Sequence, residues 1–200
     1  MSAAVLYLAS ASPRRRELLG QIGVVCVARP VDLDEARQPE EAAGDYVLRL
    51  ARDKAEAGWL RYGAAEARPV LAADTAVVVD GEIFGKPRDQ TECSTMLARL
   101  SNRTHQVLTA VALRTQAGVE ARLSTSQVTF RALRPGESDR YWNTGEPADK
   151  AGGYAVQGHG ALFIAHLSGS YSGVMGLPLF ETAELLQRAG IDLWMPTLLR

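Results

Sequence analysis

The sequence has few cysteines, almost no net charge and no long apolar run, and each absence excludes a class of protein. Cys26 and Cys93 are its 2 cysteines, which provide neither a disulfide framework nor a metal-binding spacing. The formal net charge is −1, so no global basic field favours nucleic acid or a membrane surface. No stretch approaches the roughly 20 apolar residues of a membrane span, and the first arginines follow a short apolar run, the reverse of a secretory signal. We expect a cytoplasmic protein without nucleic-acid or membrane partners.

The 200 residues, of which 46% are hydrophobic, are enough for one sizeable core and too few for two separate domains. We therefore expect a single domain over residues 1–200. Residues 5–9 are a short apolar run that predicts a buried strand, followed directly by a loop and a helix start. Strand, tight loop and helix in this order indicate an α/β fold, in which ligands gather where the strands end.

The segment after this first strand, residues 10–19, combines a strong helix start with positive charge. Ser12 is suited to be the N-cap and Pro13 the first helical residue. Three arginines then follow at residues 14–16, where the helix N-terminus already carries positive partial charge. One interpretation is that the arginines form a solvated basic face on a surface helix. Three arginines after such an N-cap favour the other interpretation, an anion-binding site. Ser10, Ser12 and the arginines would bind phosphates there.

Two further charged residues lie before and within the next expected helix, which we predict from Pro39 to Arg61. Glu35 lies among carboxylates at the exit of a second strand, where it is a candidate ligand for a divalent cation; a polar loop that caps the helix is the simpler interpretation. Lys54 falls on or beside the apolar stripe of the helix. Its ammonium either extends to water or reaches an anionic partner in a cleft.

Asp74 lies between two apolar runs, residues 69–73 and 77–79, which we predict as strands. An unpaired carboxylate is expensive to bury, so we expect Asp74 to face a metal ion, a cation or a water molecule that it activates. The alternative is an Asx turn that joins the two strands. A hairpin turn at residues 80–81 follows, and Lys86 brings another cation to the same edge.

The second half of the chain predicts more strands and a glycine-rich segment. Residues 105–113 alternate as a strand, residues 119–123 and 125–133 resemble two more, and a helix is expected over residues 88–100. Residues 146–158 contain enough glycine to indicate close backbone approach or positive φ. Gln157 lies near the end of that segment.

Separated stretches of the chain together resemble the Maf family of nucleoside triphosphate pyrophosphatases over nearly the whole length. They are residues 8–15 (LASASPRR), 73–75 (ADT), 85–87 (GKP), 101–107 (SNRTHQV), 149–154 (DKAGGY) with 157–158 (QG), and 174–179 (VMGLPL). Asn102 departs from the pattern, since the family usually has glycine there.

The resemblance implies a fold, a reaction and roles for individual residues. The fold would be a mixed, twisted α/β sheet flanked by helices, with two lobes and a cleft between them. The reaction would be hydrolysis of a nucleoside triphosphate to the monophosphate and pyrophosphate, with Mg²⁺ or Mn²⁺ held by Glu35. Asp74 matches the catalytic position, as general base or metal ligand, while Arg14, Thr75 and Gln157 match positions tied to substrate choice. Arg14, Arg15, Lys54 and Lys86 would bind the phosphates.

Residues 149–158 indicate the branch of the family, because they resemble the same segment in the members directed at dTTP and UTP. The amide of Gln157 has the acceptor and donors to pair with a uracil or thymine ring, although it would equally serve to hold the loop. Two other functions stay open: hydrolysis of 7-methyl-GTP, and a nucleotide sensor that regulates cell division without turnover. The resemblance also implies a homodimer.

Overall fold

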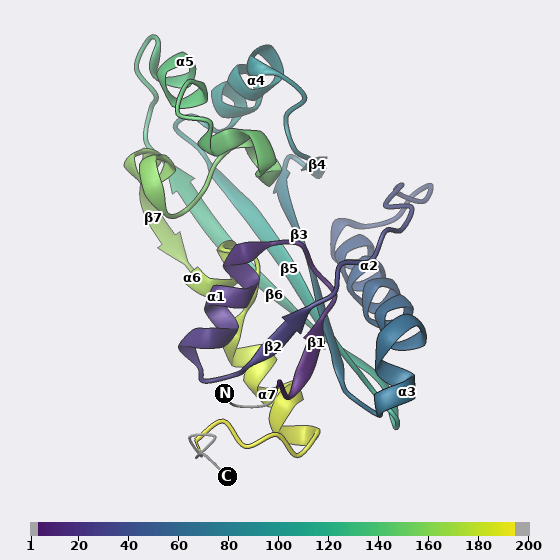
Figure 1. The fold of residues 1–200 in the computed structure, drawn as a ribbon. Coiled ribbons are helices and arrows are strands. Elements are labelled where there is room, and N and C mark those ends of the chain that lie inside the picture. The colour runs from purple at the N-terminus through teal and green to yellow at the C-terminus, as the bar shows by residue number, and fades with distance from the viewer. Residues whose placement is uncertain (1–3, 195–200) are drawn as a thin grey trace.

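A seven-stranded mixed sheet forms the centre of the computed structural model, which describes residues 4–194 (Figure 1). The strand order is β2-β1-β3-β5-β6-β7, and β4 pairs with β3 outside this path. β1 is parallel to β2 and β3, and the other pairs are antiparallel. The strands are β1 (Leu6–Leu8), β2 (Cys26–Ala28), β3 (Val70–Val79), β4 (Glu82–Phe84), β5 (Thr104–Thr115), β6 (Gly118–Phe130) and β7 (Ile164–Ser168).

Helices cover both faces of the sheet because the central strands are apolar on both sides. On one face, Ala72 and Ala76 of β3 pack with Val47, Ala51 and Ala55 of α2. On the other face, α1 and α7 pack against β1, β3 and β5. The helices are α1 (Pro13–Gln21), α2 (Ala43–Gly58), α3 (Ala64–Glu66), α4 (Gln90–Leu100), α5 (Glu137–Trp142), α6 (Tyr171–Val174) and α7 (Leu179–Arg188). None of these helices, within residues 4–194, is long and apolar enough to cross a membrane.

A second lobe is built at the far ends of the long strands β3, β5 and β6, next to α4 and α5 (Figure 1). Its core contains Phe130 and Phe163, and three short 3₁₀ segments complete it: Glu146–Asp149, Ala151–Gly153 and Gly158–Phe163. The prediction of a mixed sheet with flanking helices and two lobes is confirmed.

The edge of β3 between β1 and β4 is open, and this opening separates the two lobes. β1 pairs with β3 only at Val70 and Leu71, and β4 pairs with it only from Val77 onward. Residues 72–76 of β3 therefore have a strand neighbour on the β5 side alone. The backbone edge of this stretch faces a space that no neighbouring strand fills.

Three predicted boundaries were wrong, each for a reason outside the local sequence. The helix expected from Pro39 begins at Ala43, because Glu40 has a left-handed φ of 57°, which a helix does not tolerate. Asp74 does not interrupt a strand: its backbone stays paired opposite Ala110 within an unbroken β3. The two strands expected over residues 119–133 are one, because Ser124 continues the ladder opposite Thr109.

His105 at the start of β5 belongs to the core of the second lobe. Its ring makes edge contacts with Phe130 and Tyr154, and Nε2 lies 2.7 Å from the hydroxyl of Tyr154. Nδ1 is buried without a hydrogen-bond partner among residues 4–194. Burial lowers the pKa of His105 to about 4, so the imidazole is neutral in the folded protein at pH 7.

We expect His105→Gln to flatten the loss of stability in mild acid. The folded pKa of about 4 lies below the usual value of 6.5, so the unfolded chain takes up the proton first. The contribution of the neutral His105 ring to the free energy of unfolding is complete above pH 6.5. It is lost as the pH falls toward 4, by at most about 1.4 kcal/mol per pH unit. Urea unfolding of the wild type and of His105→Gln between pH 7 and 4 measures how steeply the free energy of unfolding of each depends on pH.

The exposed His166 on β7 provides the matched control. His166→Gln should keep the wild-type dependence of the free energy of unfolding on pH. Equal slopes for wild type and His105→Gln would show that His105 does not titrate as a buried group.

Candidate active site

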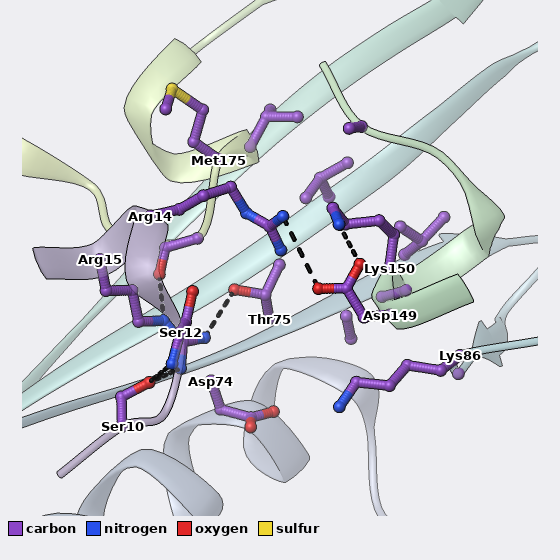
Figure 2. Close-up of a pocket in the computed structure, with 18 of the residues that line it drawn as sticks. Ser10, Ser12, Arg14, Arg15, Asp74, Thr75, Lys86, Asp149, Lys150 and Met175 are labelled. Carbon is purple, nitrogen blue, oxygen red and sulfur yellow. Dashed lines mark hydrogen bonds and ion pairs between the residues drawn. The ribbon is translucent and has the colours of Figure 1, made fainter. Parts of the chain in front are cut away.

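A cleft of about 520 Å³ opens beside the free edge of β3, between the two lobes (Figure 2). This volume is in the range of small-molecule sites. All ten site residues predicted from the sequence line it: Ser10, Ser12, Arg14, Arg15, Glu35, Lys54, Asp74, Thr75, Lys86 and Gln157. They come from segments far apart in the chain, which the open edge of β3 brings together.

The loop between β1 and α1 forms one wall of the cleft. Ser12 is the N-cap residue and Pro13 begins α1, as predicted, but the Ser12 side chain makes no capping hydrogen bond. Its backbone N–H instead donates to Ser10 Oγ at 3.2 Å. The hydroxyl of Ser12 and the first N–H groups of the helix are therefore available to a ligand.

Arg15 fastens this wall to the floor of the cleft. Its Nε donates to the carbonyl of Gly176 at 2.8 Å, and its Nη1 donates to Ser10 Oγ at 3.1 Å. Nη2 lies 3.4 Å from Thr75 Oγ1 on β3, and Thr75 in turn contacts Thr109 Oγ1 on β5 at 3.1 Å. Burial lowers the pKa of Arg15, and the carboxylate of Asp74 opposes this effect. An arginine remains charged after such a shift, so it keeps a fixed positive charge beside β3.

Lys54 lies between two carboxylates on the opposite face of β3. It occupies the buried stripe of α2 beside Ala55, so its side chain points toward the sheet and not toward solvent. Nζ is 2.7 Å from Asp74 Oδ1 and 2.6 Å from Glu35 Oε1. The sequence left two places for this ammonium, and the structure shows the second, an anionic partner in a cleft.

Asp74 is a carboxylate held in a poorly hydrated place. Burial raises its pKa above the usual value, while the ammonium of Lys54 and the guanidinium of Arg15 oppose this effect. Oδ1 accepts from Lys54, and Oδ2 accepts no hydrogen bond from residues 4–194. A carboxylate of raised pKa with a free oxygen toward a cleft is suited to accept a proton from a bound water.

The second lobe supplies the other wall, and it includes charges that the sequence did not single out. Asp149 forms an ion pair with Lys150 and lies 3.9 Å from Arg14 across the cleft. Figure 2 shows these three side chains facing one another, with Lys86 extending toward the middle of the cleft. Lys86 is exposed and makes no ion pair within the described part of the chain. Five cations and three carboxylates line the cleft, so it is positive in a chain of net charge −1.

Gln157 occupies the same wall, at the end of the glycine-rich segment. It is half-buried and lines the cleft, and its side-chain amide makes no hydrogen bond with residues 4–194. Gly152 and Gly153 on the same segment have φ of 69°, which explains the glycines that the sequence places there. An amide with unused donors and an unused acceptor therefore lines the cleft.

The family is decided by comparison with known proteins. The model of the family described as Maf-like protein matches residues 5–189. The chain belongs to the Maf-like protein family. This match covers both walls of the cleft and the whole of β3.

Curated relatives span nearly the whole chain. A protein of Bordetella avium (strain 197N) is 54% identical over 194 residues, covering 94% of this chain and 96% of its own. A protein of Nitrosomonas europaea is 51% identical over 199 residues, with the same two coverages. Both are named dTTP/UTP pyrophosphatase. Among solved structures, the Staphylococcus aureus Ham1 protein matches 92% of this chain and 96% of its own with a TM-score of 0.54; at 14% identity it supports the fold alone.

A metal ion in this Maf-like cleft would have few protein ligands. Residues 4–194 contain no group of three or more His, Cys, Asp or Glu side chains that could hold one. Glu35, with 54% of its side chain exposed, and Asp74 are separated by the ammonium of Lys54. This arrangement fits Mg²⁺, which keeps several waters and uses one or two carboxylates together with phosphate oxygens.

We expect Lys54→Met to raise the pKa of Asp74 further. The substitution keeps the apolar stem of the side chain and removes the ammonium that opposes the effect of burial. Carboxyl carbon chemical shifts, followed by NMR over pH and assigned with Asp74→Asn, measure the change.

Lys86→Met is the control, because it removes an ammonium from the same cleft without breaking an ion pair to Asp74. It should leave the Asp74 titration close to that of the wild type. An unchanged pKa in Lys54→Met would mean that the ion pair does not govern the charge of Asp74.

Proposed function

We propose that the protein hydrolyses dTTP and UTP to the nucleoside monophosphate and pyrophosphate. The observation that carries the proposal is the identity of 51–54%, over more than nine-tenths of the chain, with proteins named dTTP/UTP pyrophosphatase. The cleft supports it, since its lining is rich in cations and also presents an unpaired amide.

The phosphates would bind on the cationic side of the cleft. Arg14 and Lys86 are the cations of the cleft with the weakest ion pairing. Arg14 has one distant partner, Asp149 at 3.9 Å, and Lys86 has none among residues 4–194. A triphosphate would bring several negative charges to them and to the N-terminus of α1. Arg15 holds the wall in place and adds charge that stabilises the leaving pyrophosphate.

Asp74 would act on the attacking water. Its Oδ2 orients the water and accepts a proton as the oxygen of the water bonds to phosphorus and the α–β phosphoanhydride bond breaks. Lys54 holds Oδ1 at 2.7 Å, which fixes the direction of Oδ2. Because burial raises the pKa of Asp74 toward the working pH, the carboxylate becomes a stronger base than an exposed aspartate.

A divalent cation belongs to this proposal. Glu35 would hold it at the exposed edge of the cleft, with the phosphates and water as the remaining ligands. Such an ion neutralises charge on the triphosphate as the bond breaks. Lys54 would then keep its contact with Asp74, while Glu35 turns from Lys54 to the ion.

The base would be read by Gln157 on the opposite wall. Its amide has one acceptor oxygen and two N–H donors, which pair with the N–H and a carbonyl of uracil or thymine. A cytosine or adenine ring presents a ring-nitrogen acceptor and an amino group instead, so an amide held in one orientation is left unpaired, which costs affinity in a partly desolvated site.

The proposal is tested with a panel of standard and 5-modified nucleoside triphosphates and 7-methyl-GTP, each with Mg²⁺, Mn²⁺ or chelator. We expect the highest kcat/KM on UTP and dTTP, and no product without a divalent ion. Asp74→Asn keeps the side-chain volume and removes the base, so it should fold normally and lose turnover. Turnover of 7-methyl-GTP in preference, or no product from the wild type, as for a nucleotide sensor, would contradict the proposal.

We expect Gln157→Ala to lower kcat/KM selectively on pyrimidine substrates. The loss on UTP should be on the order of a hundredfold if the amide pairs with the base. The rate on 7-methyl-GTP, whose larger purine ring places its N–H and carbonyl elsewhere, should change little. Steady-state kinetics on both substrates measure the difference, and an equal loss on both would give Gln157 a structural role only.

A further inference from the structure

The loop that carries Gln157 is held from outside the cleft by two side chains with no part in the proposed chemistry. Tyr141 is buried at the end of α5, and Glu146 lies at the start of the glycine-rich segment with 19% of its side chain exposed. Neither belongs to the residues that line the cleft. The Tyr141 hydroxyl donates to Glu146 Oε1 at 2.7 Å, so the two form one connected pair.

This pair binds the backbone on both sides of Gln157. Before it in the sequence, the N–H of Ala155 donates to the Tyr141 hydroxyl at 3.0 Å. After it, the N–H of His159 donates to Glu146 Oε2 at 2.9 Å. The N–H of Gly160 adds a bond to Oε1, also at 2.9 Å. The segment 155–160 is thus closed by bonds at both ends, with Gln157 between them.

The glycines of this loop show how close the pair comes. A Cβ on Gly158 would lie 2.2 Å from Glu146 Oε2, and the φ of that residue is 84°. A Cβ on Gly160 would lie 2.3 Å from the carbonyl of Ala155 and 2.7 Å from the Tyr141 hydroxyl. The Glu146 carboxylate therefore occupies the space that a side chain at Gly158 would need, and the Tyr141 hydroxyl and the Ala155 carbonyl occupy that space at Gly160.

We propose that Tyr141 and Glu146 are positioning residues that hold Gln157 in place to read the base. Glu146 is suited to this because it is ionised: burial raises its pKa, but the N–H of Gly160, the hydroxyl of Tyr141 and the N–H of His159 together lower it. Hydrogen bonds to a charged acceptor are stronger than bonds between neutral groups. Tyr141 and Glu146, which we call the clamp, therefore hold the backbone of this loop firmly. The inference rests on the proposed function, because it assigns these residues to base selection.

Glu146→Gln tests the clamp, because its NH₂ group would face a backbone N–H and break at least one of the bonds. Tyr141→Phe removes the bond from the N–H of Ala155 together with the bond to Glu146. The readout is the ratio of kcat/KM on UTP to that on CTP, which differs from UTP at the edge that Gln157 would read. We expect each variant to lower this ratio about tenfold, mainly through KM on UTP. In a Gln157→Ala background the same substitutions should change the ratio no further, because the reading amide is already gone.

Glu137→Gln is the matched control. Glu137 lies in the same lobe and also accepts three bonds, two from Arg131 and one from the N–H of Arg134, but within the described residues it makes no hydrogen bond to residues 155–160. It should lower Tm while the UTP/CTP ratio stays at the wild-type value. If Glu146→Gln behaves in the same way, or lowers the ratio further in the Gln157→Ala background, the positioning role is refuted.

Amide hydrogen exchange of residues 155–160 without nucleotide separates this inference from the proposed function. We expect exchange to be about tenfold faster in Glu146→Gln, and unchanged in Glu137→Gln. Wild-type protein that hydrolyses neither UTP nor dTTP would refute the proposed function, and the exchange rates would still decide the clamp. Equal exchange in wild type and Glu146→Gln would refute the clamp even where UTP is hydrolysed.

Discussion

The site depends on one feature of the sheet, the open edge of β3 at residues 72–76. β1 stops pairing at Leu71 and β4 begins at Val77, so this stretch has a strand neighbour on one side alone. Adjacent residues of a strand point to opposite faces, yet at an open edge both faces are reached from one cleft. Asp74 can therefore meet Lys54 from α2, while Thr75 meets Arg15 from α1. A neighbouring strand along this edge would separate the two groups.

Several residues that the sequence singled out, and that line one cleft in the structure, conflict with their local context. Arginines at a helix N-terminus, a lysine on an apolar helix stripe and a carboxylate between apolar runs each cost free energy where they stand. Such conflicts predict a partner but not its identity. Lys54 and Asp74 lie 20 residues apart and each resolves the burial of the other. That solution also explains why β3 continues through Asp74, where a break was expected: a paired carboxylate does not have to leave the strand.

Other parts of the site were beyond sequence reasoning because they conflict with nothing locally. Asp149 and Lys150 are neighbours of opposite charge in a polar segment, and only the tertiary fold places Asp149 near Arg14. Glu146 follows a glycine and precedes a proline, an ordinary turn, and the N–H groups that it accepts lie 13 and 14 residues further on. The one local signal is the glycine content, which indicates close backbone approach without naming what approaches.

The charges of the cleft are arranged so that the substrate completes them. Lys54 is shared by Glu35 and Asp74, while Asp149 serves both Lys150 and Arg14. A buried ion pair barely repays the desolvation of its members, so these contacts add little stability. Their effect is to orient each side chain in the cleft while the more exposed contacts can still be exchanged. An incoming triphosphate would draw Arg14 away from Asp149, whereas the pair of Lys54 and Asp74, which is more deeply buried, would stay together. The more exposed contacts would then change on binding, and the buried contact would hold the reacting carboxylate still.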